Sequence, residues 1–223
     1  MMTISMKVYV TAEDFKMKRL ENNQYTIYDA QILIYYCFLY KNHRIIELTN
    51  KARILTEFLI NNDIQVIVPE SIIIEIRRKG FEKIISEYTD SSYPSQVLGL
   101  PINPSNTFKY RLQRKIEGNF NKMINSSWFE VNKYIPSLNS INSIKSFFEN
   151  IEDEDKLEEF LTKKNRVDPV PSNTDLELIA FSKDMKAPVV SNDYDITFFA
   201  EELFKKDLSY YLYDFMDLEI YAN

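Results

Sequence analysis

Short apolar segments alternate with longer amphipathic segments along most of this 223-residue chain. Residues 25–28, 64–68, 187–191 and 208–215 have the composition of buried strands, and helical patterns separate them. Strands that are separated by helices pair in parallel, and such a sheet is covered by helices on both faces. The sequence therefore predicts an α/β fold, with three layers (α/β/α) around a central, mostly parallel sheet.

Some of the helical patterns have recognisable starts. Pro69 suits the first turn of a helix, where its fixed φ is favourable and no amide donor is needed. Thr174 and Glu177, three positions apart, predict a capping box at the start of a later helix. The expected helices are 29–40, 49–61, 69–87, 108–126, 140–164, 172–185 and 196–206, and a short strand is expected at 6–10.

One domain is expected over residues 1–223. The three glycines and eight prolines are spread out, so no flexible linker stands out. Segment 88–170 is less regular than the rest and separates the two regular parts of the chain. Because a structureless segment of this length is rare within a compact domain, we expect a largely helical insertion that carries substrate or subunit contacts.

The composition excludes several classes of protein. The longest apolar stretch, 30–40, is too short to span a bilayer, and no signal-peptide pattern begins the chain, so a cytoplasmic protein without membrane contact is expected. The single cysteine, Cys37, excludes an internal disulfide and a multi-cysteine zinc site, and we expect it to be buried. The single histidine, His43, argues against triad and zinc chemistry and is expected at the surface.

Positive charge is concentrated in one part of an acidic chain. The net charge is −6, but residues 77–133 contain ten Lys or Arg against five Asp or Glu. Aromatic residues lie among the cations near 108–120, and such a combination can stack on and steer single-stranded RNA. An amphipathic helix with a solvated charged face is the alternative interpretation. The candidate RNA-binding residues are Arg77, Arg78, Lys109, Arg111, Arg114 and Lys115.

Four acidic residues occupy positions where strand-like segments end or helices begin. Asp29 and Asp193 follow strands, Asp175 lies in the first turn of a helix, and Glu75 lies in the helix after the second strand. In an open α/β sheet, ligand sites form beyond the carboxyl ends of the strands, where such side chains can converge. Converging carboxylates need a cation, and Mg²⁺ or Mn²⁺ prefers their hard oxygen atoms. The pattern predicts a metal site suited to phosphodiester cleavage.

Each acid alone has an ordinary structural explanation. Asp175 could be a first-turn helix residue, Asp193 and Asp195 could be turn formers, and Glu75 could be half of a surface ion pair. Their joint position in a β-α order favours the metal site.

At these positions the chain resembles the PIN-domain nucleases, which include toxin ribonucleases of toxin–antitoxin pairs and several RNA-processing enzymes. The resemblance covers about 25–87 and 172–215. It rests on an aspartate after the first strand, a glutamate in the helix after the second strand, an aspartate before a Leu-Ile-Ala segment, and a Ser-Asn-Asp segment after the next strand. Here these are Asp29, Glu75, Asp175 before Leu178–Ala180, and Ser191–Asp193.

The resemblance implies a Mg²⁺- or Mn²⁺-dependent endoribonuclease. Asp29, Asp175 and Asp193 would be the main metal ligands, Glu75 would support a second ion or the attacking water, and Asp195 would assist. RNA is the implied substrate. An antitoxin or another protein partner and a homo-oligomer are both compatible with the resemblance, and apolar residues 210–215 could pack inside or join a dimer.

Three alternatives remain open. A more distant likeness is to the protein-only ribonuclease P group, which inserts helices at the same place and would make the chain a tRNA-processing nuclease. That group carries an arginine-rich stretch before the position of Asp175, whereas residues 152–159 of this chain are acidic. The second alternative is a catalytically weak PIN-fold protein that binds RNA or acts as a scaffold, and the third is a phosphatase or DNA nuclease of similar topology.

Overall fold

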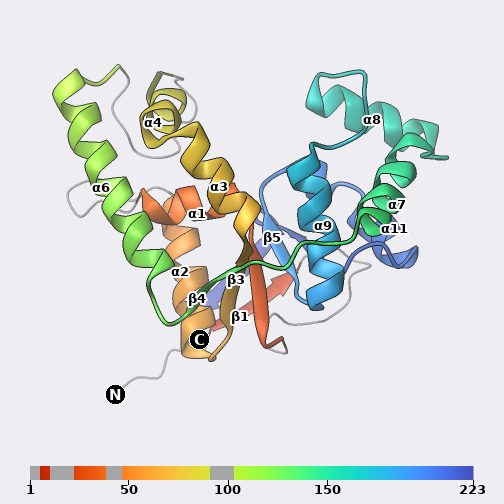
Figure 1. Cartoon of the computed structure of the whole chain (residues 1–223), viewed down its shortest axis with the longest axis horizontal. Helices are drawn as coiled ribbons and strands as arrows, with labels where there is room; N and C mark the ends of the chain where they lie inside the picture. Colours follow the sequence, from red (N-terminus) through yellow and green to blue (C-terminus); the bar gives the residue numbers. More distant parts are fainter. Residues whose placement is uncertain (1–5, 11–22, 39–46, 91–102, 223) are drawn as a thin grey trace.

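Five parallel strands form the centre of the structure, in the order β4-β3-β2-β5-β6 (Figure 1). This computed structural model describes residues 6–10, 23–38, 47–90 and 103–222. The strands are β2 (Tyr25–Tyr28), β3 (Gln65–Pro69), β4 (Phe129–Asn132), β5 (Val189–Ser191) and β6 (Leu212–Asp214).

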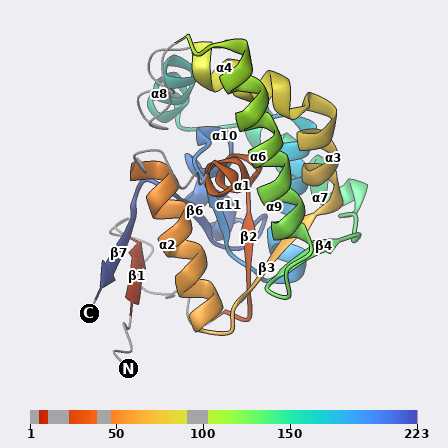
Figure 2. The ribbon, with the colours of Figure 1, turned by 90° about the vertical axis from the view of Figure 1, so that its left-hand side faces the viewer.

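Helices cover both faces of the sheet, which confirms the predicted three-layer α/β/α fold. On one side lie α1, α2 and α6, and on the other side lie α7 and α9 (Figures 1 and 2). The larger helices are α1 (Ala30–Cys37), α2 (Glu47–Asn61), α3 (Glu70–Lys79), α4 (Phe81–Asp90), α6 (Asn106–Ile124), α7 (Leu138–Glu149), α8 (Glu154–Lys164) and α9 (Asn173–Met185). Two short helices follow, α10 (Tyr194–Thr197) and α11 (Ala200–Lys205).

The central strands are apolar because both of their faces are buried. Ile27, Val66, Val68, Val189 and Val190 are all fully shielded from solvent. Cys37 is also buried in this core, as expected. His43 and the end of the helix predicted at 29–40 lie outside the described residues.

The sheet order brings two distant parts of the chain together. β2 pairs with β3 on one side and with β5 on the other. The chain leaves β2 toward β3 and leaves β5 toward β6, so the connections diverge between β2 and β5. In open α/β sheets a crevice forms at such a point, beyond the carboxyl ends of the strands. Asp29 and Asp193 follow these two strands, so both lie at this end of the sheet, where the connections diverge.

Three predicted helices are each divided in two. Gly80, with φ of 76°, separates α3 from α4, because its positive φ ends α3 and its N–H bonds to the Ile76 carbonyl. Asp153 begins α8 as a new N-cap, so the helix predicted at 140–164 is two helices, α7 and α8. The helix predicted at 196–206 is likewise two short helices, α10 and α11.

Two strands were not predicted. β4 lies within segment 88–170 and pairs with β3, so this mostly helical segment also supplies an edge of the central sheet. β7 (Leu218–Ala222) pairs with the predicted strand β1 (Met6–Val10) in a separate antiparallel sheet. The two ends of the described chain therefore lie together (Figure 2).

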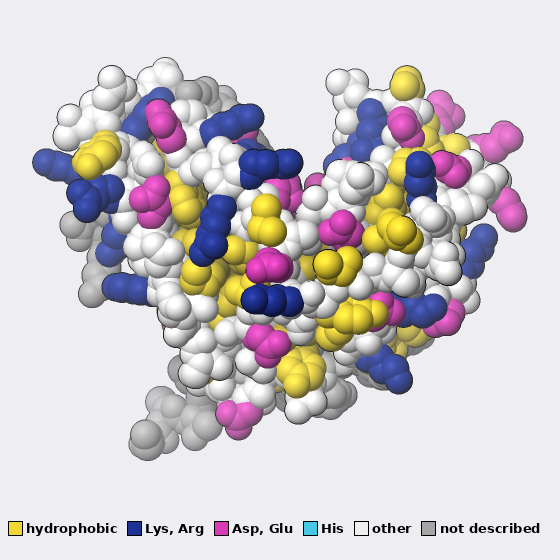
Figure 3. Space-filling model, in the orientation of Figure 1, with side chains coloured by type: hydrophobic (Ala, Val, Ile, Leu, Met, Phe, Trp, Pro, Cys, Tyr) yellow, Lys and Arg dark blue, Asp and Glu magenta, His cyan; other side chains and the backbone are white. Residues whose placement is uncertain are grey.

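The surface is hollowed between two lobes (Figure 3). One lobe contains α3, α4 and α6, and the other contains α7, α8 and α11 (Figure 1). The strands of the central sheet end on the side that faces this hollow, where α3 leaves β3 and α9 begins. Within the described ranges, no helix combines the length and apolar character needed to cross a membrane.

Candidate active site

Asp29 lies at the junction of β2 and α1 and is only 5% exposed. It is the N-cap of α1, where its carboxylate accepts a hydrogen bond from the Ala30 amide. Its own N–H donates to the Val190 carbonyl of β5, 3.2 Å away. The carboxylate is thus fixed at the carboxyl end of β2, next to β5.

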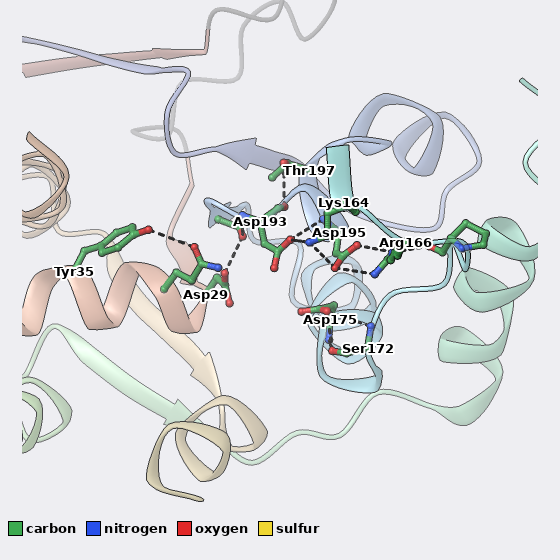
Figure 4. A network of polar contacts seen from close by, with 12 residues as sticks. Asp29, Tyr35, Lys164, Arg166, Ser172, Asp175, Asp193, Asp195 and Thr197 are labelled. Carbon is green, nitrogen blue, oxygen red and sulfur yellow. Dashed lines mark hydrogen bonds and ion pairs between the residues drawn. The ribbon is translucent and has the colours of Figure 1, made fainter. Parts of the chain in front are cut away.

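Ser191, the last residue of β5, joins two of the acidic residues. Its hydroxyl donates to Oδ2 of Asp29 at 2.8 Å and accepts from the N–H of Asp193 at 2.9 Å. Asn192 completes the connection, because its Nδ2 donates to the Tyr35 hydroxyl of α1 at 3.1 Å (Figure 4). The segment after β5 is therefore tied to α1 through side chains.

Asp175 lies in the first turn of α9, as predicted, but in a different cap. The predicted capping box of Thr174 and Glu177 is wrong, since the residues that form it are Ser172 and Asp175. The Ser172 hydroxyl donates to Oδ2 of Asp175 at 2.7 Å, and the Asp175 N–H donates back to the Ser172 hydroxyl at 3.3 Å. The N-cap is therefore Ser172, and the helix begins two residues earlier than the Thr-Glu pair implies.

Asp193 and Asp195 lie side by side at the start of α10. Asp193 is the N-cap, and its Oδ1 accepts from the Asp195 N–H at 2.9 Å. Asp195 is 7% exposed, so its carboxylate needs a partner within the protein.

Two cations at the end of α8 and just after it provide that partner. Lys164 Nζ lies 2.7 Å from Oδ1 of Asp193 and 2.8 Å from Oδ2 of Asp195. Arg166 contacts both oxygens of Asp195, at 2.7 Å through Nη2 and 3.2 Å through Nη1. Figure 4 shows the resulting row, from Asp29 through Asp193 to Asp195 and its cations, with Asp175 beside it.

The acids without a cation have raised pKa values. Burial, opposed by the hydrogen bond from Ser191 and reinforced by the charges of Asp175 and Asp193, raises the pKa of Asp29 from 3.8 to about 7. Burial and the charges of Asp193 and Asp195 raise the pKa of Asp175 from 3.8 to about 6, against the hydrogen bond from Ser172. Asp29, Asp175 and Asp193 therefore lie close enough to repel one another.

Glu75 lies half-buried on α3. No hydrogen bond or ion pair of the described residues links it to the aspartates, whereas Ser191 joins Asp29 to Asp193, which bonds in turn to Asp195. The assignment of Glu75 as a ligand stays a prediction.

The donor chemistry of this group fits a hard divalent cation, although the ligand positions are incomplete. Mg²⁺ or Mn²⁺ would stabilise the ionised forms of carboxylates that are buried and repel one another. As placed, however, no three Asp, Glu, His or Cys side chains of the described residues are grouped closely enough to hold a metal ion. Lys164 and Arg166 neutralise Asp193 and Asp195 in this arrangement.

The predicted RNA-binding residues lie on one lobe, away from the aspartates. Arg77 and Arg78 are exposed in the last turn of α3, where cations also suit the helix dipole. Arg111, Arg114 and Lys115 are exposed on α6, and Lys109 is half-buried there. Figure 3 shows Lys and Arg side chains over this lobe, so the hollow has a basic side.

Lys164, Arg166 and Ser191 were not among the predicted site residues. Lys164 ends the acidic helix α8 and Arg166 follows it. They lie 29 positions before Asp193 and Asp195, respectively, so no local pattern marks them. Ser191 belongs to the Ser-Asn-Asp segment that was noted, and its position at a strand end beside Asp29 was the available signal.

Comparison of the sequence with known protein families and with curated proteins finds no match. The PIN-domain resemblance therefore rests on the residues quoted above alone.

Proposed function

We propose that this chain is a metal-dependent endoribonuclease that hydrolyses RNA phosphodiester bonds beside Asp29, Asp175 and Asp193. One observation carries the proposal. Three aspartates from separate elements lie near the point where the connections of a parallel sheet diverge, and burial, reinforced by their mutual repulsion, raises the pKa values of Asp29 and Asp175. A group of this kind costs stability, which is typical of a site that is kept for function rather than for folding.

The chain's own residues supply position and charge. Asp29, Asp175 and Asp193 would hold the ion. Ser191 fixes the position of the Asp29 carboxylate relative to the backbone of Asp193, because its hydroxyl bonds to both. A bound Mg²⁺ or Mn²⁺ would supply Lewis acidity and an activated water. Glu75 has no assigned role here, because no contact of the described residues ties it to the three aspartates.

The basic lobe supports RNA as the substrate. Exposed cations on α3 and α6 can neutralise phosphates along one side of the hollow. Tyr110 is 58% exposed on the same helix, and the Arg114 guanidinium lies 5.9 Å from its ring centroid. A flat aromatic surface flanked by guanidinium groups suits unpaired bases.

One observation favours a second candidate, a PIN-fold protein that binds RNA without cleaving it. Lys164 and Arg166 already neutralise Asp193 and Asp195, so these two acids do not require a metal ion for their burial. In that case the basic lobe would bind RNA and the aspartates would be structural.

Cleavage assays separate the two candidates. Labelled single-stranded RNA, tRNA, single-stranded DNA and a small phosphomonoester would each be incubated with the protein in Mn²⁺, Mg²⁺ or EDTA. The variants are Asp29→Asn and Asp193→Asn, and the matched control is Asp184→Asn, an exposed aspartate on α9 that accepts a hydrogen bond from Tyr134.

We expect metal-dependent cleavage of RNA by the wild type and by Asp184→Asn, and none by the two site variants. RNA binding without cleavage in every metal would favour the binding protein. Cleavage of DNA or of the phosphomonoester in preference to RNA would contradict the substrate class.

A further inference from the structure

We propose that Lys164 is a resident counter-ion that competes with a divalent metal ion for Asp193. The inference rests on the proposed function, since it concerns how readily the same site takes up its metal. It assigns to Lys164 a regulatory role toward the metal ion.

The contacts of Lys164 are those of a bridging cation. Its ammonium lies within 2.8 Å of one carboxylate oxygen from each of Asp193 and Asp195, and its side chain is only 21% exposed. Asp195 also has Arg166, which contacts both of its oxygens, so it stays neutralised if Lys164 leaves. Asp193 has Lys164 as its cation among the ion pairs of the described residues. A metal ion at Asp193 would therefore displace Lys164 and leave the Arg166–Asp195 pair intact.

The other two aspartates are not neutralised in this way. Among the ion pairs of the described residues, neither Asp29 nor Asp175 takes part. Their hydrogen bonds come from Ser191, Ser172 and backbone amides. If Lys164 left Asp193, all three aspartates would therefore lack a cationic side chain as a partner.

The fold keeps the lysine close to its partners. Lys164 is the last residue of α8, and Asn165 after it adopts the left-handed conformation that ends the helix. Phe160 of the same helix is fully buried, with its ring centroid 5.3 Å from that of Phe198 and 5.1 Å from that of Phe199. Those two residues follow α10, whose N-cap is Asp193, so the end of α8 and the acids belong to parts of the chain that pack together.

Competition follows from charge. Two positive ions cannot both approach Asp193 closely without repelling each other, and partial burial strengthens that repulsion. A coupling of this kind between two sites is typically worth 5- to 150-fold in affinity. In the metal-free site, Lys164 thus occupies the place at Asp193 that a metal ion would take. Removal of the lysine charge should make the site bind metal more tightly.

The first test is titration of Mn²⁺ by isothermal calorimetry into wild type, Lys164→Gln, Lys163→Gln and Asp193→Asn. We expect Lys164→Gln to bind Mn²⁺ roughly tenfold more tightly than wild type at the same stoichiometry. Lys163 is the matched control, because it is the neighbouring lysine, pairs with Glu159 at 2.7 Å and is 41% exposed. Lys163→Gln should bind Mn²⁺ as the wild type does, and Asp193→Asn should bind it much more weakly.

A second measurement uses the wild type alone and does not depend on how the variant folds. Lysine acetylation is followed by mass spectrometry in EDTA and in Mn²⁺. Displacement predicts that Lys164 reacts several-fold faster in Mn²⁺, whereas Lys163 reacts at the same rate in both.

The outcomes distinguish this inference from the proposed function. If wild type binds Mn²⁺ through Asp193 while Lys164→Gln binds it no better and Lys164 acetylation does not change, the counter-ion role is wrong and the metal site stands. If Lys164→Gln binds Mn²⁺ and the wild type does not, the competition is supported. If neither protein binds Mn²⁺, both proposals are overturned.

Discussion

The hydroxyl of Ser191 donates a 2.8 Å hydrogen bond to the buried carboxylate of Asp29, 162 positions earlier in the chain. The bond is possible because β5 and β2 are neighbours in the sheet and both end at this point. The same hydroxyl accepts from the Asp193 amide, so it sets two of the three aspartates relative to each other.

Ser191→Ala should destabilise the protein by about 1–3 kcal/mol, because a buried carboxylate oxygen would lose its donor. The hydrogen bond lowers the pKa of Asp29, so the loss should be larger at pH 8, where the carboxylate is more often ionised, than at pH 5. Urea unfolding at both pH values measures it. Ser182→Ala is the control, since Ser182 is also buried and hydrogen-bonded, to the Ile179 carbonyl at 2.6 Å. A loss that is equal at the two pH values would contradict the role of Ser191.

In EDTA, the stability of the wild type should fall as the pH rises from about 4 to about 7. The unfolded chain releases the protons of Asp29 and Asp175 near pH 4, whereas the folded chain holds them until their pKa values of about 7 and about 6. The folded state binds more protons in this window, so the free energy of unfolding decreases with pH.

Asp29→Asn should remove the larger part of the decrease in the free energy of unfolding with pH. The contribution of Asp29 to this decrease is at most about 4 kcal/mol, at about 1.4 kcal/mol for each pH unit. Asparagine keeps the N-cap of α1, so the comparison isolates the charge. The measurement is urea unfolding from pH 4.5 to 7.5, with Asp184→Asn expected to parallel the wild type. A constant difference between Asp29→Asn and wild type would show that Asp29 titrates normally.

Glu75→Gln should leave the Mn²⁺ affinity within about twofold of wild type, because no hydrogen bond or ion pair of the described residues links Glu75 to the three aspartates. A lost carboxylate ligand typically costs more than tenfold, as expected for Asp193→Asn. Calorimetric titration of both variants makes the comparison. A large loss in Glu75→Gln would mean that α3 moves toward the aspartates when metal binds, as the PIN-domain resemblance implies.

Replacement of Arg111, Arg114 and Lys115 together by Gln should weaken binding of single-stranded RNA. If each contacts one phosphate, the slope of log affinity against log salt should change by about 2. Folding should be unaffected, because all three side chains are exposed on α6. Fluorescence anisotropy over a range of salt concentrations measures the slope. A control with Lys145, Lys163 and Lys205 replaced, each paired one helical turn away, should bind RNA as the wild type does.

The sequence predicted β1, β2, β3, β5 and β6 and missed β4 and β7. β3 contains the apolar run Val66–Val68 inside the sheet, which the strand predicted at 64–68 includes. β4 lies at the edge of the sheet, is only partly buried and contains Glu130 and Asn132, so it has no apolar run to reveal it. Gly80 shows a different limit, because a single glycine is tolerated in a helix, and only its positive φ reveals the break.

The site was predictable to the extent that parallel strands place their carboxyl ends together. That rule located Asp29, Asp175 and Asp193. The residues that neutralise or orient them depend on contacts between elements that are far apart in the chain. Lys164 reaches Asp193 because α8 packs on the aromatic residues after α10, and no spacing in the sequence expresses that contact.

The pairing of β1 with β7 determines how the molecule would respond to force. Met6 lies opposite Ala222, and Val10 lies opposite Leu218, so both chain ends emerge at the same end of the ribbon. Because antiparallel hydrogen bonds run perpendicular to the strands, tension applied at the two ends would load these bonds one pair at a time. The β1–β7 hydrogen bonds would therefore break in sequence at low force. The five-stranded sheet lies between β1 and β7 along the chain, so it would bear no load until that pairing is broken.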